Sequence, residues 1–511
     1  MKRSLLAAFS TAAILTLTAC TTSQGSGSGT VPRGGDVRLA LTADVSTFDP
    51  ARNSSGGDYV LNQLMYSPLI GLDEGNIPVP RLAARWALSA TGVTLTLRTG
   101  LTCSDGSPLT ASQAAASLNY YRKNATAAAY AFGPANAADK TTITGDDATG
   151  TVSIQLTTPW TELLPALSLP ATGIVCKPGL DNPDKLAAGD VPGAGTGPYT
   201  LTENDRGSRY TLSLREGFDA YPLYKNLTRG TPPKKYQLTV VKSESTIANQ
   251  MQTGQIDFGS FTGPDAARLD KGFSTLSVPT VRFYLMFNER PGHPGADPDF
   301  RRAVAQAVDA QAFGKVLGGG TLLKTYVDPS AACASDDAGL LVHIDSAAAG
   351  KVLAGKTINV VGTRAVADGA GNTYIAEALR TAGATVTLNS AEQATLSSSV
   401  LPGGDWDINV MASLSTRLVQ GASLLTGAEP PKGRNYGAVH NGGFEAGLNT
   451  AVTTVDEGAK CAAWQQAQAA LLTAIDIVPL STLNLRYVYR DGLTLLGPPT
   501  QLDLTSLRTT A

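Results

Sequence analysis

The first thirty residues restrict where the rest of this chain can fold. Met1-Lys2-Arg3 gives a positively charged start, apolar and small residues run from Leu5 to Ala19, and Cys20 follows. A charged region, a short apolar region and small residues at a cleavage point are the parts of an export signal. The apolar stretch is shorter than the about 20 residues that a bilayer crossing needs. The sequence therefore predicts a signal peptide over residues 1–19 and a body that folds outside the cytoplasm.

The end of this signal resembles a bacterial lipobox. Leu17-Thr18-Ala19-Cys20 matches the pattern in which the cysteine is acylated and becomes the first residue of the mature protein. The Gly/Ser-rich sequence that follows is typical of flexible coil that cannot bury a core. We therefore expect residues 20–33 to be a lipid anchor at Cys20 and a flexible linker, on the outer face of the cytoplasmic membrane. The alternative is an ordinary secretory peptide with a chance cysteine.

Composition limits the kind of protein that follows the linker. About 480 residues are too many for one core and enough for two or three domains. Only 16% of the residues are charged and the formal net charge is −2, which argues against nucleic acid as a partner because such binding needs a basic face. With 42% hydrophobic residues, 53 glycines and 29 prolines, we expect a turn-rich α/β protein without a further membrane-crossing stretch.

Four cysteines remain once Cys20 is assigned to lipid: Cys103, Cys176, Cys333 and Cys461. An even number in an exported protein favours two disulfides, and four cysteines allow three connectivities. We expect Cys103–Cys176 and Cys333–Cys461, because this pairing keeps each bridge within one half of the chain. Free buried thiols are the alternative.

Hydrophobic periodicity places strands and helices along the chain. Strands are expected at 36–41, 93–98, 357–361, 385–388, 406–411 and 476–480, and helices at 59–66, 110–122, 301–308, 346–353, 370–382 and 461–474. Strands that alternate with helices of this length predict βαβ units and a parallel sheet in the second half.

Catalytic and cofactor motifs are weak or missing in the sequence. Residues 350–357 fit the phosphate-loop pattern G-x-x-x-x-G-K-[ST], but the expected helix precedes them and a strand follows, the reverse of a working loop. The sequence holds no G-x-S-x-G, S-x-x-K or H-E-x-x-H pattern. The three histidines, His293, His343 and His440, are far apart. We therefore expect neither an enzyme nor a metal or cofactor site.

Several segments, read in order, resemble one family. They are residues 34–38 with 47–51 (an opening strand and D-P loop), 64–69 (Y-x-P-L), 80–86 (P-x-L-A-x-x-W), 104–111 (S-D-G-x-P-L-T-A), 195–199 (G-T-G-P-Y), and 287–288 with 300–309 (F-N and R-x-A-x-x-x-A-x-D). This set resembles the extracytoplasmic solute-binding proteins of ABC importers, family 5, which handle dipeptides and oligopeptides. It covers most of residues 34–310; from about 320 to 450 the likeness is thinner.

The resemblance implies the fold and the partners. We expect a large type II periplasmic-binding-protein fold, with two α/β lobes joined by two crossovers: lobe I from residues 34–280 plus 478–511, and lobe II from 281–477. The implied function is a lipid-anchored, monomeric substrate-binding component that captures a peptide or related small solute and delivers it to ABC permease and ATPase subunits.

The resemblance also implies which residues face the ligand. They are Asn53, Ser54 and Ser55 after the D-P loop, Asn288 at the end of a strand, Ser413, Ser415, Thr416 and Arg417 after the strand at 406–411, and Tyr436. Many relatives carry G-W-x-x-D in the third region, where the aspartate holds a peptide ammonium. Here residues 412–417 read A-S-L-S-T-R, so Arg417 is expected to pair with an anionic group or to be solvated. Tyr436 is expected in the pocket wall or in the core.

Two other functions are compatible with these observations. A repurposed envelope lipoprotein on the same fold, acting in assembly or signalling, would fit the missing aspartate. An envelope hydrolase would need a nucleophile that the sequence does not show.

Overall fold

The structure is a computed structural model that describes residues 30–511 except 126, 137–139, 228 and 497–501. The predicted signal peptide, Cys20 and residues 21–29 of the predicted linker lie outside the described residues.

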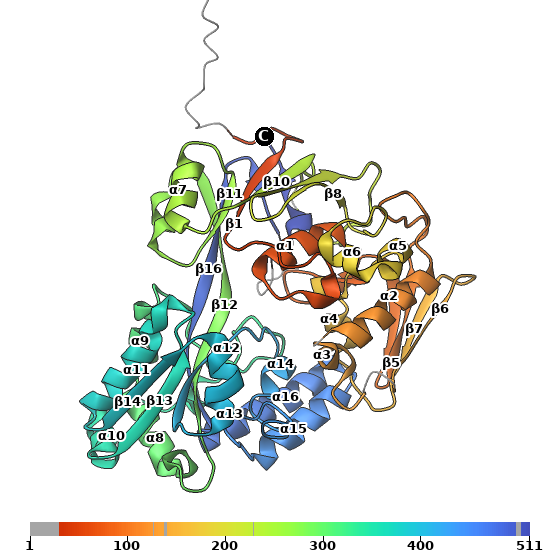
Figure 1. Cartoon of the computed structure of the whole chain (residues 1–511). Coiled ribbons are helices and arrows are strands. Elements are labelled where there is room, and N and C mark those ends of the chain that lie inside the picture. The colour runs from red at the N-terminus through yellow and green to blue at the C-terminus, as the bar shows by residue number, and fades with distance from the viewer. Residues whose placement is uncertain (1–29, 126, 137–139, 228, 497–501) are drawn as a thin grey trace, which may run out of the picture.

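A ten-stranded sheet runs through both lobes of the molecule (Figure 1). Its strand order is β14-β13-β15-β12-β16-β11-β1-β10-β9-β8. The strands are β1 (Val37–Leu41), β8 (Tyr199–Asp205), β9 (Arg209–Leu214), β10 (Lys235–Val240), β11 (Phe258–Phe261), β12 (Phe273–Phe287), β13 (Thr357–Thr363), β14 (Thr385–Ala391), β15 (Ile408–Ser413) and β16 (Ile477–Arg490). The expected α/β architecture is therefore present.

The two longest strands, β12 and β16, connect the lobes. They pair antiparallel from Phe273 opposite Arg490 to Met286 opposite Ile477, with irregularities after Pro279 and Arg282. At one end β16 pairs with β11, and at the other end β12 pairs with β15. Figure 1 shows this two-stranded ribbon running from the upper part of the molecule to the lower part. These are the two crossovers that the resemblance implies.

Lobe II holds the alternating helices and strands that the sequence predicts. Strand β13 pairs in parallel with β14 and with β15. The helices of this lobe are α8 (Pro298–Ala307), α9 (Ala310–Val316), α10 (Ser346–Leu353), α11 (Ala370–Thr381), α12 (Gln393–Thr395), α13 (Leu401–Gly403), α14 (Leu418–Ala422), α15 (Gly442–Thr453) and α16 (Glu457–Ala474). Because α10 precedes β13, residues 350–357 have the reverse of a phosphate-loop geometry, as expected.

Lobe I combines the other end of the large sheet with a four-stranded antiparallel sheet of order β4-β5-β7-β6. Its strands are β4 (Ala83–Ser89), β5 (Gly92–Leu97), β6 (Thr142–Asp146) and β7 (Thr151–Gln155), beside the pair β2 (Ile70–Leu72) and β3 (Pro78–Pro80). The helices are α1 (Gly56–Met65), α2 (Ala111–Asn124), α3 (Ala128–Phe132), α4 (Leu163–Ala166), α5 (Lys177–Asp181), α6 (Pro183–Ala188) and α7 (Glu244–Gln252). The short pair β17 (Leu493–Thr494) and β18 (Arg508–Thr509) lies near the C-terminal end.

Helix starts follow from local side-chain chemistry. Thr110 accepts a hydrogen bond from the Gln113 amide at the start of α2, and Asp297 caps α8, where Pro298 occupies the first turn. Such caps satisfy amide groups that have no partner inside the helix. Helix α2 begins within one residue of the predicted start at 110, whereas α8 begins at Pro298, three residues before the predicted start at 301.

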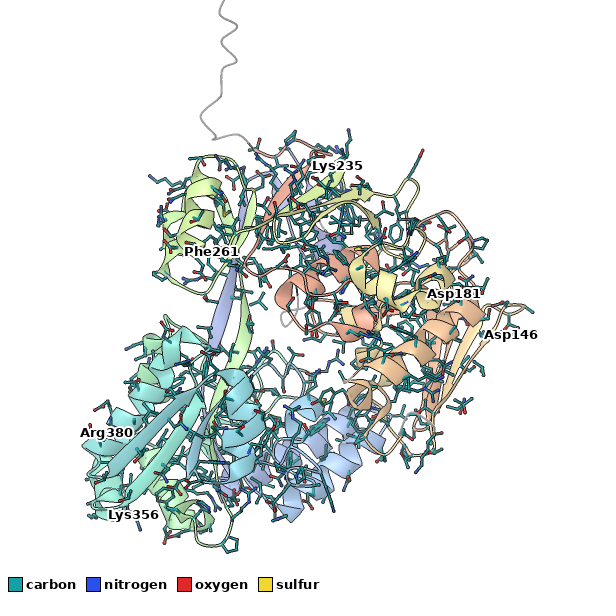
Figure 2. All side chains as sticks on the ribbon, viewed as in Figure 1. Asp146, Asp181, Lys235, Phe261, Lys356 and Arg380 are labelled. Atoms are coloured by element: carbon teal, nitrogen blue, oxygen red, sulfur yellow. A yellow bond between two sulfur atoms is a disulfide. The ribbon has the colours of Figure 1, made fainter. Side chains whose placement is uncertain are left out.

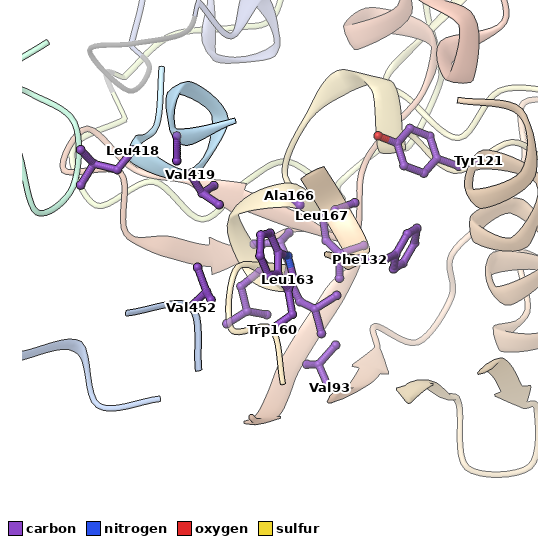
Figure 3. Close-up of a cluster of buried hydrophobic side chains, with 14 of the residues drawn as sticks. Val93, Tyr121, Phe132, Trp160, Leu163, Ala166, Leu167, Leu418, Val419 and Val452 are labelled. Atoms are coloured by element: carbon purple, nitrogen blue, oxygen red, sulfur yellow. The ribbon is translucent and has the colours of Figure 1, made fainter. Parts of the chain in front are cut away.

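One buried apolar cluster joins the two lobes (Figure 3). Trp160 and Leu163 of lobe I belong to the same cluster as Leu418, Val419 and Val452 of lobe II. A backbone hydrogen bond of 2.8 Å from the Thr161 amide to the Val452 carbonyl runs beside it. The lobes are therefore in contact on this side of the crossing strands.

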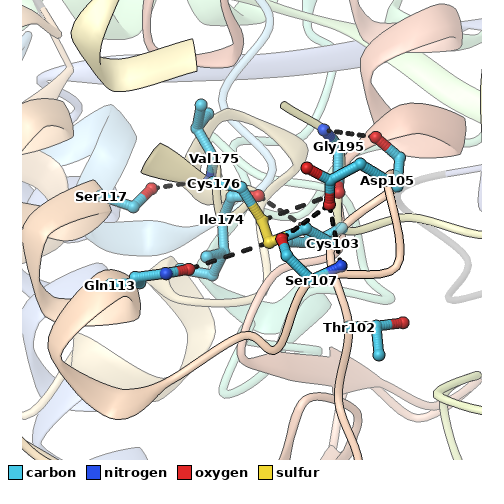
Figure 4. The surroundings of a disulfide bond; sticks show 12 residues. Thr102, Cys103, Asp105, Ser107, Gln113, Ser117, Ile174, Val175, Cys176 and Gly195 are labelled. Carbon is cyan, nitrogen blue, oxygen red and sulfur yellow. Dashed lines mark hydrogen bonds between the residues drawn. A yellow bond between two sulfur atoms is a disulfide. The ribbon is translucent and has the colours of Figure 1, made fainter. Parts of the chain in front are cut away.

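Both expected disulfides are present. Cys103 is bonded to Cys176 and Cys333 to Cys461, with Cα–Cα distances of 6.2 and 4.7 Å. Figure 4 shows the first bridge beside the turn that contains Asp105 and Ser107. The Ser107 amide donates to Asp105 at 2.9 Å, so this bridge joins a closed turn to the segment that leads into α5.

Charged side chains lie on the outer surfaces of both lobes. Figure 2 shows Lys356 and Arg380 at the end of lobe II that is remote from the crossing strands, and Lys235 at the far side of lobe I. The apolar residues of the sheet and its helices form the cores.

Candidate functional site

A cavity of about 480 Å³ lies where β12 crosses between the lobes. Lobe II supplies most of its wall, from the end of β15, the segment around α12 and α13, and the turn that contains Tyr436. Lobe I contributes Tyr130 of α3. The lining residues are Tyr130, Val281, Ala365, Val366, Gln393, Leu396, Ser397, Leu401, Met411, Ala412, Ser413, Leu414, Ser415, Gln420, Leu424, Arg434 and Tyr436. Apolar walls with a few polar groups are typical of sites for small molecules.

Three of the predicted ligand-facing residues line this cavity: Ser413, Ser415 and Tyr436. Ser413 ends β15, and its hydroxyl oxygen accepts a hydrogen bond from the Ser415 amide at 3.2 Å. Thr416 lies next to them, where its amide and hydroxyl donate to the Gln420 side-chain oxygen at 3.0 and 3.2 Å. The loop after β15 therefore folds back onto α14 and presents its serines to the cavity.

Arg417 reaches across to the other lobe and does not line the cavity. Its Nη2 donates to the Pro165 carbonyl at 2.5 Å and lies 3.5 Å from the Ser168 hydroxyl. Burial lowers the pKa of Arg417 to about 10, although the charge of Glu162 opposes this shift. In this structure Arg417 thus holds lobe II against α4.

The residues at the start of α1 bind one another. Ser55 caps the helix, and Asp58 accepts the amides of Ser54 and Ser55, each at 2.9 Å. Asn53 accepts a hydrogen bond from the Asn62 side chain. These three predicted residues do not line the cavity near β15, and their polar groups stabilise the helix start.

Asn288 follows the end of β12 and is fully buried. Its Nδ2 donates to the carbonyls of Gly404 and Trp406, each at 2.8 Å, and its Oδ1 accepts from Arg290 at 3.0 Å. The amide thus connects β12 to the loop that precedes β15. The cavity lies at the other end of β15, among residues that do not include Asn288.

Asp58 makes stability at the start of α1 depend on pH. Burial alone would raise the pKa of Asp58, but hydrogen bonds from Ser46, Ser54 and Ser55 outweigh burial and hold the pKa below its ordinary value. We expect Asp58→Asn to lower the free energy of unfolding by about 2 kcal/mol at pH 7, as for hydrogen bonds to a charged group. The difference should shrink as the pH falls below about 4 and through the folded pKa, because the parent carboxylate is then protonated.

Urea unfolding of Asp58→Asn and its parent at pH 7, 5 and 3 measures this effect. The control Asp205→Asn, at an exposed position of β8, should differ from the parent by less than about 0.5 kcal/mol. A difference for Asp58→Asn that is constant from pH 7 to pH 3 would contradict the expectation.

Sequence reasoning missed Tyr130 and Arg434. The Arg434 Nη1 donates to the Tyr130 hydroxyl at 2.5 Å, so the two side chains connect the lobes at the cavity. Tyr130 lies in an alanine-rich stretch without a local motif, and Arg434 has only the predicted residue Tyr436 as a nearby signal in its turn.

Across the part of the chain that the structure describes, no group of three or more His, Cys, Asp or Glu side chains is arranged to hold a metal ion. In the same residues, no helix combines the length and the apolar character that a bilayer crossing requires.

Comparison with known proteins identifies the family. Residues 78–421 match the bacterial extracellular solute-binding proteins, family 5. A substrate-binding protein from Microbacterium hydrocarbonoxydans, solved in complex with 4-hydroxybenzoate hydrazide, is 37% identical, with 93% of this chain and 100% of that chain covered and a TM-score of 0.77. The chain belongs to family 5 of the solute-binding proteins. This membership confirms the resemblance inferred from the motifs.

More distant structures share the fold of this family 5 protein. The ABC transporter substrate-binding protein CtaP from Listeria monocytogenes is 20% identical (94% of this chain and 100% of that chain covered, TM-score 0.78). DppA from Helicobacter pylori, in complex with the peptide STSA, is 18% identical (94% and 99% covered, TM-score 0.72). No functionally curated protein matches the chain. The two-lobed fold of this family 5 protein is thus the one that these solute-binding proteins have.

Proposed function

We propose that the protein is the lipid-anchored substrate-binding component of an ABC importer, which captures a peptide or a related small solute between its lobes. The observation that carries this proposal is the cavity at β12, with walls from lobe II and Tyr130 from lobe I. Lobe I comprises residues 34–280 plus 478–511 and lobe II residues 281–477, so that one boundary lies within β12 and the other at the start of β16. Residues 1–19 are the signal peptide, and acylated Cys20 with the linker to residue 33 holds the monomer on the outer face of the cytoplasmic membrane.

Capture follows from contacts that both lobes make with one cargo molecule. A cargo that touches Tyr130 and the β15 loop together binds the closed arrangement more strongly than an open one, and this difference shifts the population toward closure. The permease then recognises the closed form, and the ATPase subunits drive import. Binding of this kind needs shaped walls and polar partners and no nucleophile.

A ligand panel tests the proposal. It contains dipeptides and tripeptides, sugars, and 4-hydroxybenzoate hydrazide, because the relative from Microbacterium hydrocarbonoxydans was solved with that compound. We expect at least one member to raise the melting temperature by a few degrees, since a cargo at 100 times its Kd adds about 2.7 kcal/mol to the free energy of unfolding. Differential scanning fluorimetry gives the readout, and no shift across the whole panel would contradict the proposal.

One observation favours a second function, in envelope assembly or signalling without transport. The loop at 412–417 lacks an aspartate, and Arg417 is bonded to the backbone of lobe I. Deleting the gene and measuring uptake of a cargo found in the panel separates the two functions. Loss of uptake supports the importer, whereas unchanged uptake with a defective envelope supports the alternative.

A further inference from the structure

The lining of the cavity carries positive charge without a compensating acid. Arg434 is the only ionisable side chain among the lining residues apart from the two tyrosines, and none of these described residues is Asp or Glu. The other polar members are serines and glutamines, which are neutral. A positively charged group of a ligand would therefore lose its water without meeting a carboxylate in this wall.

Arg434 offers hydrogen bonds at the edge of the cavity. Its side chain is exposed, and its contact across the cavity is the Tyr130 hydroxyl at 2.5 Å. A carboxylate or carbonyl oxygen can take the position of that hydroxyl, and a charged donor makes a stronger bond to such an acceptor than a neutral donor does. Tyr130 and Tyr436 line the same cavity and supply aromatic rings beside the ligand.

A second guanidinium lies behind the same wall. Arg282 of β12 is fully buried, follows the lining residue Val281, and is in register opposite the lining residue Ser413 of β15. Its Nη1 donates to the Thr280 carbonyl at 2.9 Å, whereas Nε and Nη2 have no hydrogen-bond partner within the described residues. The side chains opposite each other in paired strands share a face, so Arg282 lies on the face that carries Ser413.

Neighbouring polar groups on this face are also unsatisfied. Tyr284, opposite Met411 in the β12–β15 register, has a buried hydroxyl without a partner in the described part of the chain, as has the side-chain amide of Asn409. Buried polar groups in proteins are nearly always hydrogen-bonded. The unpaired donors of Arg282 and Tyr284 behind this wall are therefore free to bond acceptor atoms of a ligand that reaches them, and the Asn409 side chain offers one donor and one acceptor group.

We propose that this cavity selects solutes that carry carboxylate or carbonyl oxygens and no ammonium group. The inference rests on the proposed function, in which the cavity is the cargo site. Arg434 binds the acceptor oxygen at the edge of the cavity. Arg282 lies behind the β12–β15 wall near the buried acid Asp328 and contributes its unpaired donors from there. Peptides with a free N-terminal ammonium bind weakly, and N-blocked or acidic solutes of the same size bind well.

Two matched pairs of probes test this selectivity by isothermal titration calorimetry. N-acetyl-dialanine has a carboxylate and no ammonium, whereas dialanine amide has an ammonium and no carboxylate. Benzoate and benzylamine make the same comparison on an aryl group. We expect the anion of at least one pair to bind about tenfold or more tightly than its cationic counterpart, because a hydrogen bond from a charged donor is stronger than one between neutral groups.

Variants of the exposed Arg434 assign the selectivity without disturbing the core. Arg434→Gln should reduce the affinity for the anionic probe about tenfold, and Arg434→Glu should reverse the preference within each pair. Arg302→Gln, at an exposed position of α8, is the matched control and should bind as the parent does.

The outcomes separate this inference from the proposed function. If dialanine amide and benzylamine bind as tightly as the anions, or more tightly, the cavity is a cargo site but the selectivity is overturned. If Arg434→Gln leaves the preference unchanged, the role of Arg434 is overturned. If these four probes and the whole ligand panel show no binding, the proposed function fails and the selectivity fails with it.

Discussion

Replacing both Cys333 and Cys461 by alanine should lower the free energy of unfolding by about 4–5 kcal/mol. The bridge joins residues 128 apart in the sequence, and closing a loop of this size removes that much chain entropy from the unfolded state. The segment that contains Cys333 has little regular structure between α9 and α10. Besides the bridge, the Gln468 side chain of α16 bonds this segment at the Cys333 carbonyl and the Ser335 amide, each at 3.0 Å. Guanidinium unfolding of the double variant and of the oxidised parent measures the loss.

The second bridge is the matched control for this experiment. Cys103 and Cys176 are 73 residues apart, so their replacement by alanine should cost about 0.5 kcal/mol less than removal of Cys333–Cys461. The folded parent should show no free thiol at these four positions by thiol titration. A loss below about 1 kcal/mol for both double variants would contradict a structural role for the bridges.

Asp257→Ala should be the most destabilising single substitution that we predict, with a loss of about 3–5 kcal/mol. Asp257 is 1% exposed and accepts hydrogen bonds from Arg38 at 3.0, 2.8 and 2.6 Å, while the Arg490 Nε lies 3.4 Å from its carboxylate. The carboxylate thus connects β1, β11 and the end of β16. Its removal takes away the counter-charge of a buried guanidinium, which is far more costly than loss of a surface ion pair.

Urea unfolding at pH 7 measures the effect of Asp257→Ala. The control Asp265→Ala removes the carboxylate of the exposed pair Asp265–Arg268 and should cost less than about 1 kcal/mol. Equal losses for the two variants would show that the buried carboxylate has no special role in joining the three strands.

Local sequence predicted the second half of the fold closely. Helix α10 has the predicted bounds, and β13, α11 and β14 begin at the predicted residues, because periodicity and caps act within one element. The length of β12 was not predicted from its pattern. Pro279 interrupts the sequence pattern of this strand. Its partner β16 is about two hundred residues away in the sequence, so the pairing that defines the strand has no local signal.

The motifs that identify the family are mostly packing elements. In the G-T-G-P-Y segment, a Cβ on Gly197 would lie 2.4 Å from the Leu64 carbonyl oxygen, and the Thr196 hydroxyl donates to the Ile174 carbonyl at 2.5 Å. Only glycine permits this approach of the segment to the end of α1. Such motifs therefore predict the fold and carry little information about the cargo.

The candidate site could be predicted only in part. Ser413, Ser415 and Tyr436 line the cavity, and their ligand contacts stay a prediction. The orientation of the Arg417 side chain depends on its hydrogen bond to the Pro165 carbonyl of the other lobe. The Tyr130 side chain approaches Arg434 only because the lobes are in contact. Contacts between residues 250 or more positions apart cannot be derived from local pattern.

The place of β16 has a consequence for the order of folding. This late strand lies between β11 and β12 in the ten-stranded sheet, so it completes the part of the sheet in each lobe. As the chain emerges N-terminus first, β11 and β12 each present an open edge until residues 477–490 arrive, and such edges are prone to wrong pairing. Long-range pairing of this kind folds slowly, so a chain that is released before β16 should need a chaperone to avoid aggregation.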